Sequence, residues 1–181
     1  MITIRDSGNN NISYGNLRFE WVRHFLYTNY NVPLIVECIG ITYPNPDYFV
    51  KRKHSDYFIM ELIIEGEGTL VNNDVIYPLK PNTLYLLKPD SRHEYFPKVG
   101  APFKKIWINF FSETFKKTLE SLFIADMPVF HDTDLQTYFN HMIDISKTSI
   151  NNEDICYDVL EILFSILLKL CRAATACTNN S

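Results

Sequence analysis

Residue types that could hold a metal ion occur at His54, Glu61 and His93, but their spacing does not match a metal site. One common kind of metal-binding small β-barrel uses His-x-His, a Glu three or four residues later, and a distant His. Here Arg52 stands in place of the first His, and the position of the Glu is apolar. Two histidines are too few, because a catalytic zinc or iron needs about three protein ligands. The sequence therefore predicts no metal and no cofactor, and His54 is interpreted as a loop residue at a strand start.

Glu61 lies within an otherwise apolar run, and two interpretations of it remain open. A carboxylate on a buried face needs partners, since an isolated buried charge is costly. On the solvated face of a barrel, Glu61 would need no such partner. His93 and Tyr95 follow a Pro-Asp-Ser turn at the rim of the predicted barrel. They either belong to a ligand pocket or pack as ordinary loop residues.

Lys105 and Trp107 share one face of a predicted strand over residues 103–111. A Trp beside hydrogen-bonding groups is how proteins bind sugars and other ring-shaped polar ligands. A Trp at the centre of a strand is, however, more often part of the core. No Ser-His-Asp, Cys-His, phosphate-loop or paired-acid motif is specific enough to indicate catalysis. The sequence thus predicts a binding site and no catalytic residues.

These side chains are positioned by short strands. The segment 57–95 contains four of them, over residues 57–65, 69–71, 75–77 and 83–88. In the first, the even positions are all apolar, which is the two-residue period of a pleated strand with unequal faces. Further strands are predicted over residues 34–43, 48–53 and 103–111. Evenly spaced short strands with Gly, Asn and Pro turns indicate a small antiparallel barrel or jelly roll.

After residue 111 the apolar period becomes helical, and three helices are predicted. Ser112 is predicted to cap a helix over residues 113–123. A second helix begins at Asp132 or Thr133. The third runs from residue 151 to about residue 174, with carboxylates in its first turn, where the helix dipole favours them.

The third helix carries two apolar stripes, whereas a helix lying on a single barrel needs one. Either a neighbouring helix of this chain or another subunit could cover the second stripe. The subunit is preferred, because so few helices are available. The side chains predicted for this dimer interface are Ile155, Val159, Ile162, Leu163, Ile166 and Leu170.

Composition limits the possible partners. A chain of 181 residues supports one domain with a full core and an appended helical segment. The net charge of −4 argues against a nucleic-acid surface, which needs clustered Lys and Arg. The start of the chain is not a signal peptide, and the longest apolar run, 159–170, is too short and too polar to span a bilayer. A soluble cytoplasmic protein without a membrane partner is expected, with its cysteines as free thiols.

Four segments in this order and spacing resemble the N-terminal ligand-binding domain of the AraC/XylS transcription regulators, of the arabinose-regulator type. They read IEGEGTL (64–70), YPLKPNTLYLLKP (77–89), HEY (93–95) and WINF (107–110). The resemblance covers residues 34–111 and continues through the helices to about residue 172. It implies a mainly β fold, a cupin-like double-stranded β-helix (jelly-roll) barrel that binds a small effector, often a sugar. It also implies a two- to three-helix segment that forms a homodimer, and a C-terminal domain with two helix-turn-helix units.

The resemblance also implies a ligand-binding set. Arg52 falls near the family's sugar-binding arginine, and Tyr95 and Trp107 fall where its pocket aromatics occur. The predicted ligand-binding residues are Arg52, Glu61, His93, Tyr95, Lys105 and Trp107. An N-terminal arm that folds over the ligand would correspond to part of residues 1–31.

The sequence departs from the family pattern in three ways. Asn82-Thr83 replaces the usual Gly-Asp, although Asn still tolerates the left-handed turn. Lys105 replaces a more neutral residue, which indicates an effector other than arabinose, such as an acidic sugar. Nothing after Ala174 could form a helix-turn-helix. The chain is therefore expected to be an isolated sensor domain that contacts DNA only through a domain outside this sequence.

The predicted divisions are an arm (1–31), an effector-binding barrel (32–111), a helical dimerisation segment (112–174), and a disordered tail or linker (175–181). The preferred hypothesis is the effector-sensing and dimerisation domain of a bacterial regulator. The alternatives are a stand-alone cupin enzyme, such as a sugar isomerase or epimerase, and a structural dimer module with an empty barrel.

Overall fold

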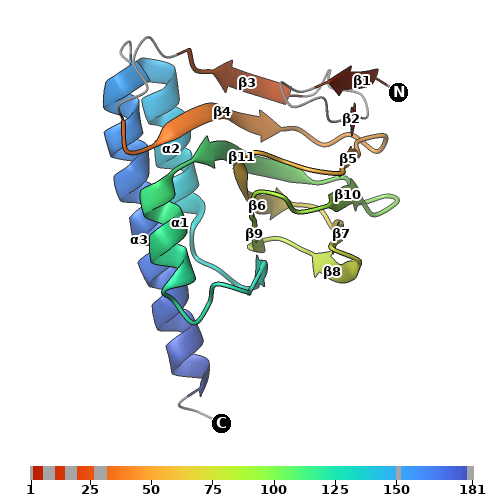
Figure 1. Ribbon diagram of the computed structural model, residues 1–181. Helices are drawn as coiled ribbons and strands as arrows, with labels where there is room; N and C mark the ends of the chain where they lie inside the picture. The colour runs from red at the N-terminus through yellow and green to blue at the C-terminus, as the bar shows by residue number, and fades with distance from the viewer. Residues whose placement is uncertain (1, 6–10, 15–19, 27–31, 150–151, 179–181) are drawn as a thin grey trace.

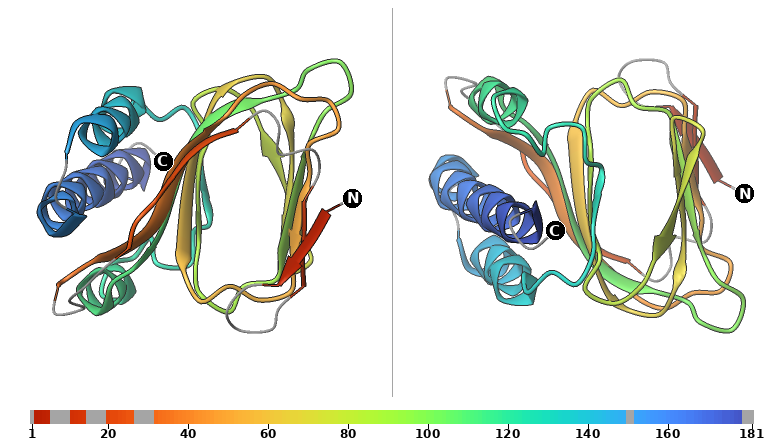
Figure 2. Two further views of the ribbon diagram at one scale, coloured as in Figure 1. Left: turned by 90° about the horizontal axis from the view of Figure 1, so that it is seen from above. Right: turned by 90° about the horizontal axis from the view of Figure 1, so that it is seen from below.

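In the computed structural model, the described residues are 2–5, 11–14, 20–26, 32–149 and 152–178. They form two six-stranded antiparallel sheets that face each other, with three helices against the far side of one sheet (Figures 1 and 2). We call the sheet beside the helices the middle sheet and the other the outer sheet. The prediction of a mainly β, jelly-roll fold with C-terminal helices is confirmed.

The outer sheet has the strand order β1-β2-β5-β10-β7-β8. Its strands are β1 (Ile2–Arg5), β2 (Asn11–Tyr14), β5 (Val50–Arg52), β7 (Gly68–Asn72), β8 (Val75–Leu79) and β10 (His93–Pro97). The middle sheet has the order β12-β9-β6-β11-β4-β3. Its strands are β3 (Glu20–His24), β4 (Ile35–Thr42), β6 (Phe58–Glu65), β9 (Leu84–Leu87), β11 (Lys104–Phe111) and β12 (Val129–Phe130).

Both faces of the middle sheet are buried, which explains why the sequence of β6 is so apolar. Phe58 and Met60 belong to the core between this sheet and the helices. Ile59 and Ile63, which point the opposite way, belong to the core between the two sheets. Successive side chains of a strand point to opposite faces, so a strand in a central layer needs apolar residues at both parities. The odd positions of β6, including Glu61, therefore face the barrel interior.

Two predicted turns have the backbone that their residues favour. Asn73 and Asp74, with φ of 47° and 69°, connect β7 to β8. This is the positive φ that a two-residue hairpin requires, and Asn and Asp tolerate it. Asn82, with φ of 62°, makes the turn before β9 in place of the family's glycine.

The structure adds strands to the predicted set in three places. β10 is an inner strand of the outer sheet, paired with β5 and β7, although its residues were predicted to lie at a rim. β3 pairs with β4, so part of the expected arm is an edge of the middle sheet. β12 pairs with β9 after α1. Residues 6–10, 15–19 and 27–31 of the expected arm lie outside the described residues.

The helices are α1 (Glu113–Glu120), α2 (Gln136–Thr148) and α3 (Asn152–Thr178). The predicted cap of α1 is confirmed, since Ser112 Oγ accepts a hydrogen bond from the Phe115 amide at 3.0 Å. α3 continues four residues past its predicted end, so residues 175–178 of the expected tail are helical. In the described part of the chain, no helix is long and apolar enough to cross a membrane.

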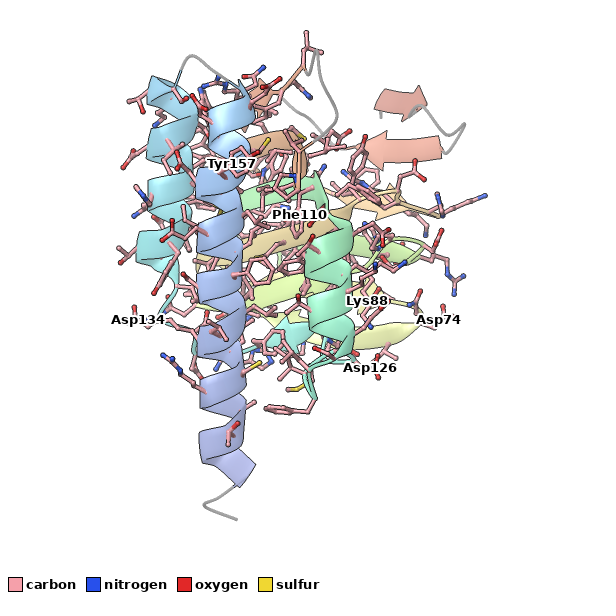
Figure 3. The ribbon with its side chains drawn as sticks, turned by 60° about the vertical axis from the view of Figure 1, so that its left-hand side comes forward. Asp74, Lys88, Phe110, Asp126, Asp134 and Tyr157 are labelled. Carbon is pink, nitrogen blue, oxygen red and sulfur yellow. The ribbon has the colours of Figure 1, made fainter. Side chains whose placement is uncertain are left out.

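The predicted dimer interface on α3 is wrong. The structure buries these side chains within a single chain, each at most 6% exposed: Ile155, Val159, Ile162, Leu163, Ile166 and Leu170. α3 lies between α1 and α2, over the middle sheet (Figure 3). Phe110 of β11 lies beneath this helical layer, with its ring 5.0 Å from that of Phe115 in α1. The alternative interpretation holds, because elements of the same chain cover both stripes.

Candidate functional site

A cavity of about 200 Å³ lies between the two sheets. Side chains of β3, β4, β6 and β11 from the middle sheet and of β5 and β10 from the outer sheet line it, together with residues 54–57. Its volume is below the roughly 300–1,000 Å³ typical of pockets for drug-sized ligands. The cavity therefore suits a small polar molecule.

Glu61, which lines this cavity, forms a buried ion pair with Lys105. The two side chains are 2% and 1% exposed, and the Lys105 ammonium donates to Glu61 Oε2. Tyr95 Oη donates to Glu61 Oε1 at 2.9 Å, and Tyr85 Oη donates to Oε2. The Lys105 ammonium also lies over the rings of Tyr95 and Tyr48, at 4.0 and 4.9 Å from their centroids. Glu61 thus faces the interior and has the partners that a buried carboxylate needs.

Burial controls the protonation of this network. It lowers the pKa of Lys105, whereas the neighbouring Glu61 carboxylate raises it. It raises the pKa of Tyr85 and of Tyr95, and the negative charge of Glu61 adds to both shifts. The tyrosines therefore remain hydrogen-bond donors at neutral pH. Because Glu61 neutralises Lys105, the positive charge of Lys105 is not available to bind an anionic ligand. Lys105 therefore does not favour an acidic sugar.

Arg52 and His93 lie opposite each other on β5 and β10. Arg52 is 9% exposed and lines the cavity. His93 does not line it: its ring lies parallel to that of Tyr95, with centroids 6.1 Å apart, and its Nδ1 lies 3.1 Å from Ser91 Oγ. Burial, reinforced by the charges of Arg52 and Lys105, lowers the pKa of His93 to about 3. His93 is therefore a neutral support for Tyr95.

Trp107 lines the cavity from β11, and two neighbours, Thr42 and Gly40, fix its ring. Its Nε1 donates to Thr42 Oγ1 at 3.0 Å, and that hydroxyl donates to Glu20 Oε1 at 2.7 Å. Gly40 is directly opposite Trp107 in the sheet. A Cβ at Gly40 would lie 2.4 Å from Cζ2 of the Trp107 ring, so only glycine leaves room for the ring there.

A second carboxylate of the cavity, Glu37, was missed by sequence reasoning. Its Oε2 accepts from Asn109 Nδ2 at 3.0 Å and from Cys38 Sγ at 3.6 Å. Burial, followed by the charge of Glu37, raises the pKa of Cys38, which keeps this thiol protonated and unreactive. Glu37 is a charged residue in an apolar strand, the signal that singled out Glu61. Glu20, Tyr48 and Tyr85 were also missed.

The structure thus gathers Arg52, Glu61, Tyr95 and Trp107 around one cavity, with Lys105 against Glu61. His93 stands apart from it, behind Tyr95. In the described part of the chain, no three side chains of the metal-binding types come together. Aromatic faces beside hydrogen-bonding groups suit the binding of a small polar ligand.

The comparison with known proteins identifies a family. The family model described as "AraC-like ligand binding domain" matches residues 35–156. No curated protein matches the chain.

Several solved structures show a similar fold at low sequence identity. YhaK from Escherichia coli is 12% identical, with a TM-score of 0.44 over 53% of this chain and 46% of YhaK. The protein plu4264 from Photorhabdus luminescens is 17% identical, with a TM-score of 0.37 over 66% of this chain and 92% of its own. A cupin protein, BF4112 from Bacteroides fragilis, is 11% identical, with a TM-score of 0.37 over 48% of this chain and 82% of its own. The chain spans about half of YhaK, and these likenesses carry no argument about function.

The family match, in contrast, covers more than half of the 181 residues, including most of the described strands that line the cavity. The chain belongs to the family of AraC-like ligand-binding domains.

Proposed function

We propose that this chain is the effector-sensing and dimerisation domain of a bacterial AraC-type transcription regulator that acts in the cytoplasm. A sugar-like small molecule binds in the cavity between the sheets. Its binding controls how a helix-turn-helix domain outside this sequence sits on DNA. The observation that carries the proposal is the cavity between the sheets, in which Trp107 and Tyr95 lie beside Arg52, within a chain of this family.

The cavity wall offers the contacts that a ring-shaped polar ligand needs. The faces of Trp107 and Tyr57, which are only partly buried, suit the apolar C–H faces of a sugar ring. Arg52 supplies several hydrogen-bond donors in a fixed plane, and Asn109 supplies an amide. Tyr95 and Trp107 are each held by hydrogen bonds, so the wall is preorganised.

Strand β3 connects the cavity to the helices. Val22 lines the cavity, whereas Arg23, next in the strand, points to the opposite face. The Arg23 guanidinium donates to the Ser149 carbonyl at 3.0 Å and to Asn152 Oδ1 at 3.2 Å. It also donates to the Ser146 carbonyl. These acceptors lie at the end of α2 and the start of α3, so a ligand with different affinities for two positions of β3 would bias the helices.

The proposed dimer interface is a third apolar stripe of α3, which lies outside the two buried stripes. The side chains there recur every three or four residues, as in a helix–helix seam: Tyr157, Leu160, Phe164, Leu168 and Cys171. Tyr157 is 57% exposed and Leu168 is 53% exposed, and Tyr157 lies near the start of α3 (Figure 3). The same stripe on a second copy can meet this one about a two-fold axis.

A charged substitution on each flank of α3 tests this interface. We expect Leu168→Glu to convert a dimer into a monomer, measured by light scattering after size exclusion. Asp158→Lys, on the exposed polar flank of the same helix away from the seam, is the control and should leave the dimer intact. A monomeric wild-type chain at 100 µM (roughly a hundred times a micromolar Kd) would contradict the proposal.

Thermal shift against sugars, sugar acids, amino sugars and polyols tests effector binding. A ligand at 100 times its Kd stabilises the folded state by about 2.7 kcal/mol. The melting temperature should rise with at least one of them. No shift with any of them would count against the proposal. Stoichiometric metal in the purified protein, together with turnover of a sugar, would instead favour the stand-alone cupin enzyme.

A further inference from the structure

The charges around the cavity are not balanced. Four carboxylates line it, those of Glu20, Glu37, Asp56 and Glu61. Lys105 neutralises Glu61, and Asp56 has His54 as a partner, whose Nε2 lies 2.9 Å from Asp56 Oδ1 and whose Nδ1 lies 2.7 Å from Asp90 Oδ1. The carboxylates of Glu20 and Glu37 are therefore the ones whose charge remains to be matched.

The contacts of these two carboxylates are with neutral groups. Glu20 accepts from the Thr42 hydroxyl, and Glu37 accepts from the Asn109 amide and the Cys38 thiol. Among the described residues, neither Glu20 nor Glu37 forms an ion pair. Hydrogen bonds from neutral donors orient a carboxylate but leave its charge in place.

Two basic side chains of the cavity wall remain, Arg52 and His24. Only Arg52 has a permanent positive charge, and it faces the two carboxylates of Glu20 and Glu37. The pKa of Tyr48, which lines the same cavity, reflects this excess. Burial raises that pKa, and the charges of Glu20 and Glu61 raise it further, whereas Arg52 lowers it. The cavity therefore has an excess of negative charge.

The aromatic side chains favour a cation as well. Tyr48, Tyr57, Tyr95 and Trp107 line the cavity, and cations bind favourably over such ring faces. The Lys105 ammonium already lies over Tyr48 and Tyr95, so Tyr57 and Trp107, which are only partly buried, are the rings offered to a ligand. An anion in the same place would meet two carboxylates and the negative faces of the rings.

We propose that the effector carries a positive charge, such as the protonated amine of an amino sugar. This charged group binds between the carboxylates of Glu20 and Glu37 and the aromatic side chains that line the cavity. This inference rests on the proposed function and narrows the class of its ligand. It reverses the expectation of an acidic sugar.

The test uses sets of three ligands that share one sugar scaffold. Glucose, glucosamine and glucuronate form one set, and the galactose and mannose equivalents form two more. Binding to the full chain is measured by calorimetry at pH 7 and low ionic strength, where charge effects are least screened. In a set that binds, the amine should bind at least tenfold more tightly than the neutral sugar, and the acid should bind most weakly.

Two variants locate the preference. In Glu20→Gln/Glu37→Gln, the amine and the neutral sugar should bind within about threefold of each other. The control is Glu94→Gln, which removes a carboxylate from the outward face of β10, where Glu94 pairs with Lys51. It should keep the full preference for the amine. If the double variant does not fold, Glu37→Gln alone should reduce the preference at least threefold.

The outcomes separate this inference from the proposed function. A neutral or acidic sugar that binds as tightly as its amine overturns the positive charge and leaves the sensor proposal standing. A preference for the amine that persists in the double variant overturns the role of Glu20 and Glu37. No binding by any member of the three sets overturns both the inference and the sugar-like class of the effector.

Discussion

The ion pair between Glu61 and Lys105 makes a sharp stability prediction. Glu61→Gln removes the anion but keeps an oxygen that can accept from Tyr85 and Tyr95. Lys105→Met removes the cation but keeps an unbranched side chain of similar length. Each single variant leaves one charged group without its counterpart, and the double variant leaves neither.

The burial of both side chains sets the size of the effect. They are 2% and 1% exposed, so solvent screens the remaining charge very little. Breaking a buried pair by removing one partner costs about 3–5 kcal/mol. At roughly 2–4 °C per kcal/mol for a chain of this size, each single variant should melt about 6–20 °C below wild type. The double variant should lose about 1–2 kcal/mol, the cost of neutral hydrogen bonds that fit less well.

Chemical denaturation of the four proteins completes a double-mutant cycle. The two single losses should add to roughly 6–10 kcal/mol, far above the loss of the double variant, so the coupling energy should exceed about 3 kcal/mol. Losses that simply add in the double variant would show that the two charges do not stabilise each other. A loss below 1 kcal/mol in Glu61→Gln would likewise refute the reasoning.

Three further predictions concern the supports of the site. The pKa of His93 falls from 6.5 to about 3 on folding, so the unfolded chain binds more protons than the folded chain between these pH values. The free energy of unfolding should therefore fall by up to about 5 kcal/mol from pH 7 to pH 3. His93→Gln should remove this share of the acid sensitivity, measured by denaturation at a series of pH values. Gly40→Ala should displace the Trp107 ring, cost about 1–3 kcal/mol and change the near-ultraviolet circular dichroism of Trp; an unchanged spectrum would contradict the packing seen at Gly40. Ser112→Ala should cost about 1 kcal/mol in denaturant unfolding, because α1 loses its cap, and an unchanged midpoint would argue against that cap.

The sequence was most informative where local chemistry decides the structure. The period of β6, the cap at Ser112 and the turn at Asn73 and Asp74 follow from the residues themselves. The strand character of β10 was missed because it has only five residues and its last is a Pro, which weakens a two-residue pattern. Its identity as an inner strand is set by partners far away in the chain.

The site was harder to predict, because it depends on register. Glu61 is opposite Trp107, and Lys105 is opposite Ile63, so the ion pair is a diagonal contact between β6 and β11. A bulge in the pairing of β11 with β4, next to Asn109, accompanies the inward position of Glu37. Neither the register nor the bulge can be read from spacing along the chain.

The same limit applies to α3. Its two stripes were recognised from their period, but a period does not say which neighbour covers each stripe. Residues of the middle sheet, α1 and α2 cover both. The partly exposed stripe proposed as the dimer interface, which begins at Tyr157, could be distinguished from the buried stripes only once the packing was known.

The central claim is that a small molecule binds inside the barrel, and two adjacent residues of β5 test it most directly. Arg52 faces the cavity, whereas Lys51 faces outward and pairs with Glu94 at 2.5 Å. The measurement is calorimetric titration of the best-binding neutral sugar, whose affinity the charge of Arg52 does not oppose, into wild type, Arg52→Met and Lys51→Met. We predict one site per chain, an affinity at least tenfold weaker in Arg52→Met, and an unchanged affinity in Lys51→Met. Equal affinity in all three proteins would place the ligand outside the cavity and contradict the account.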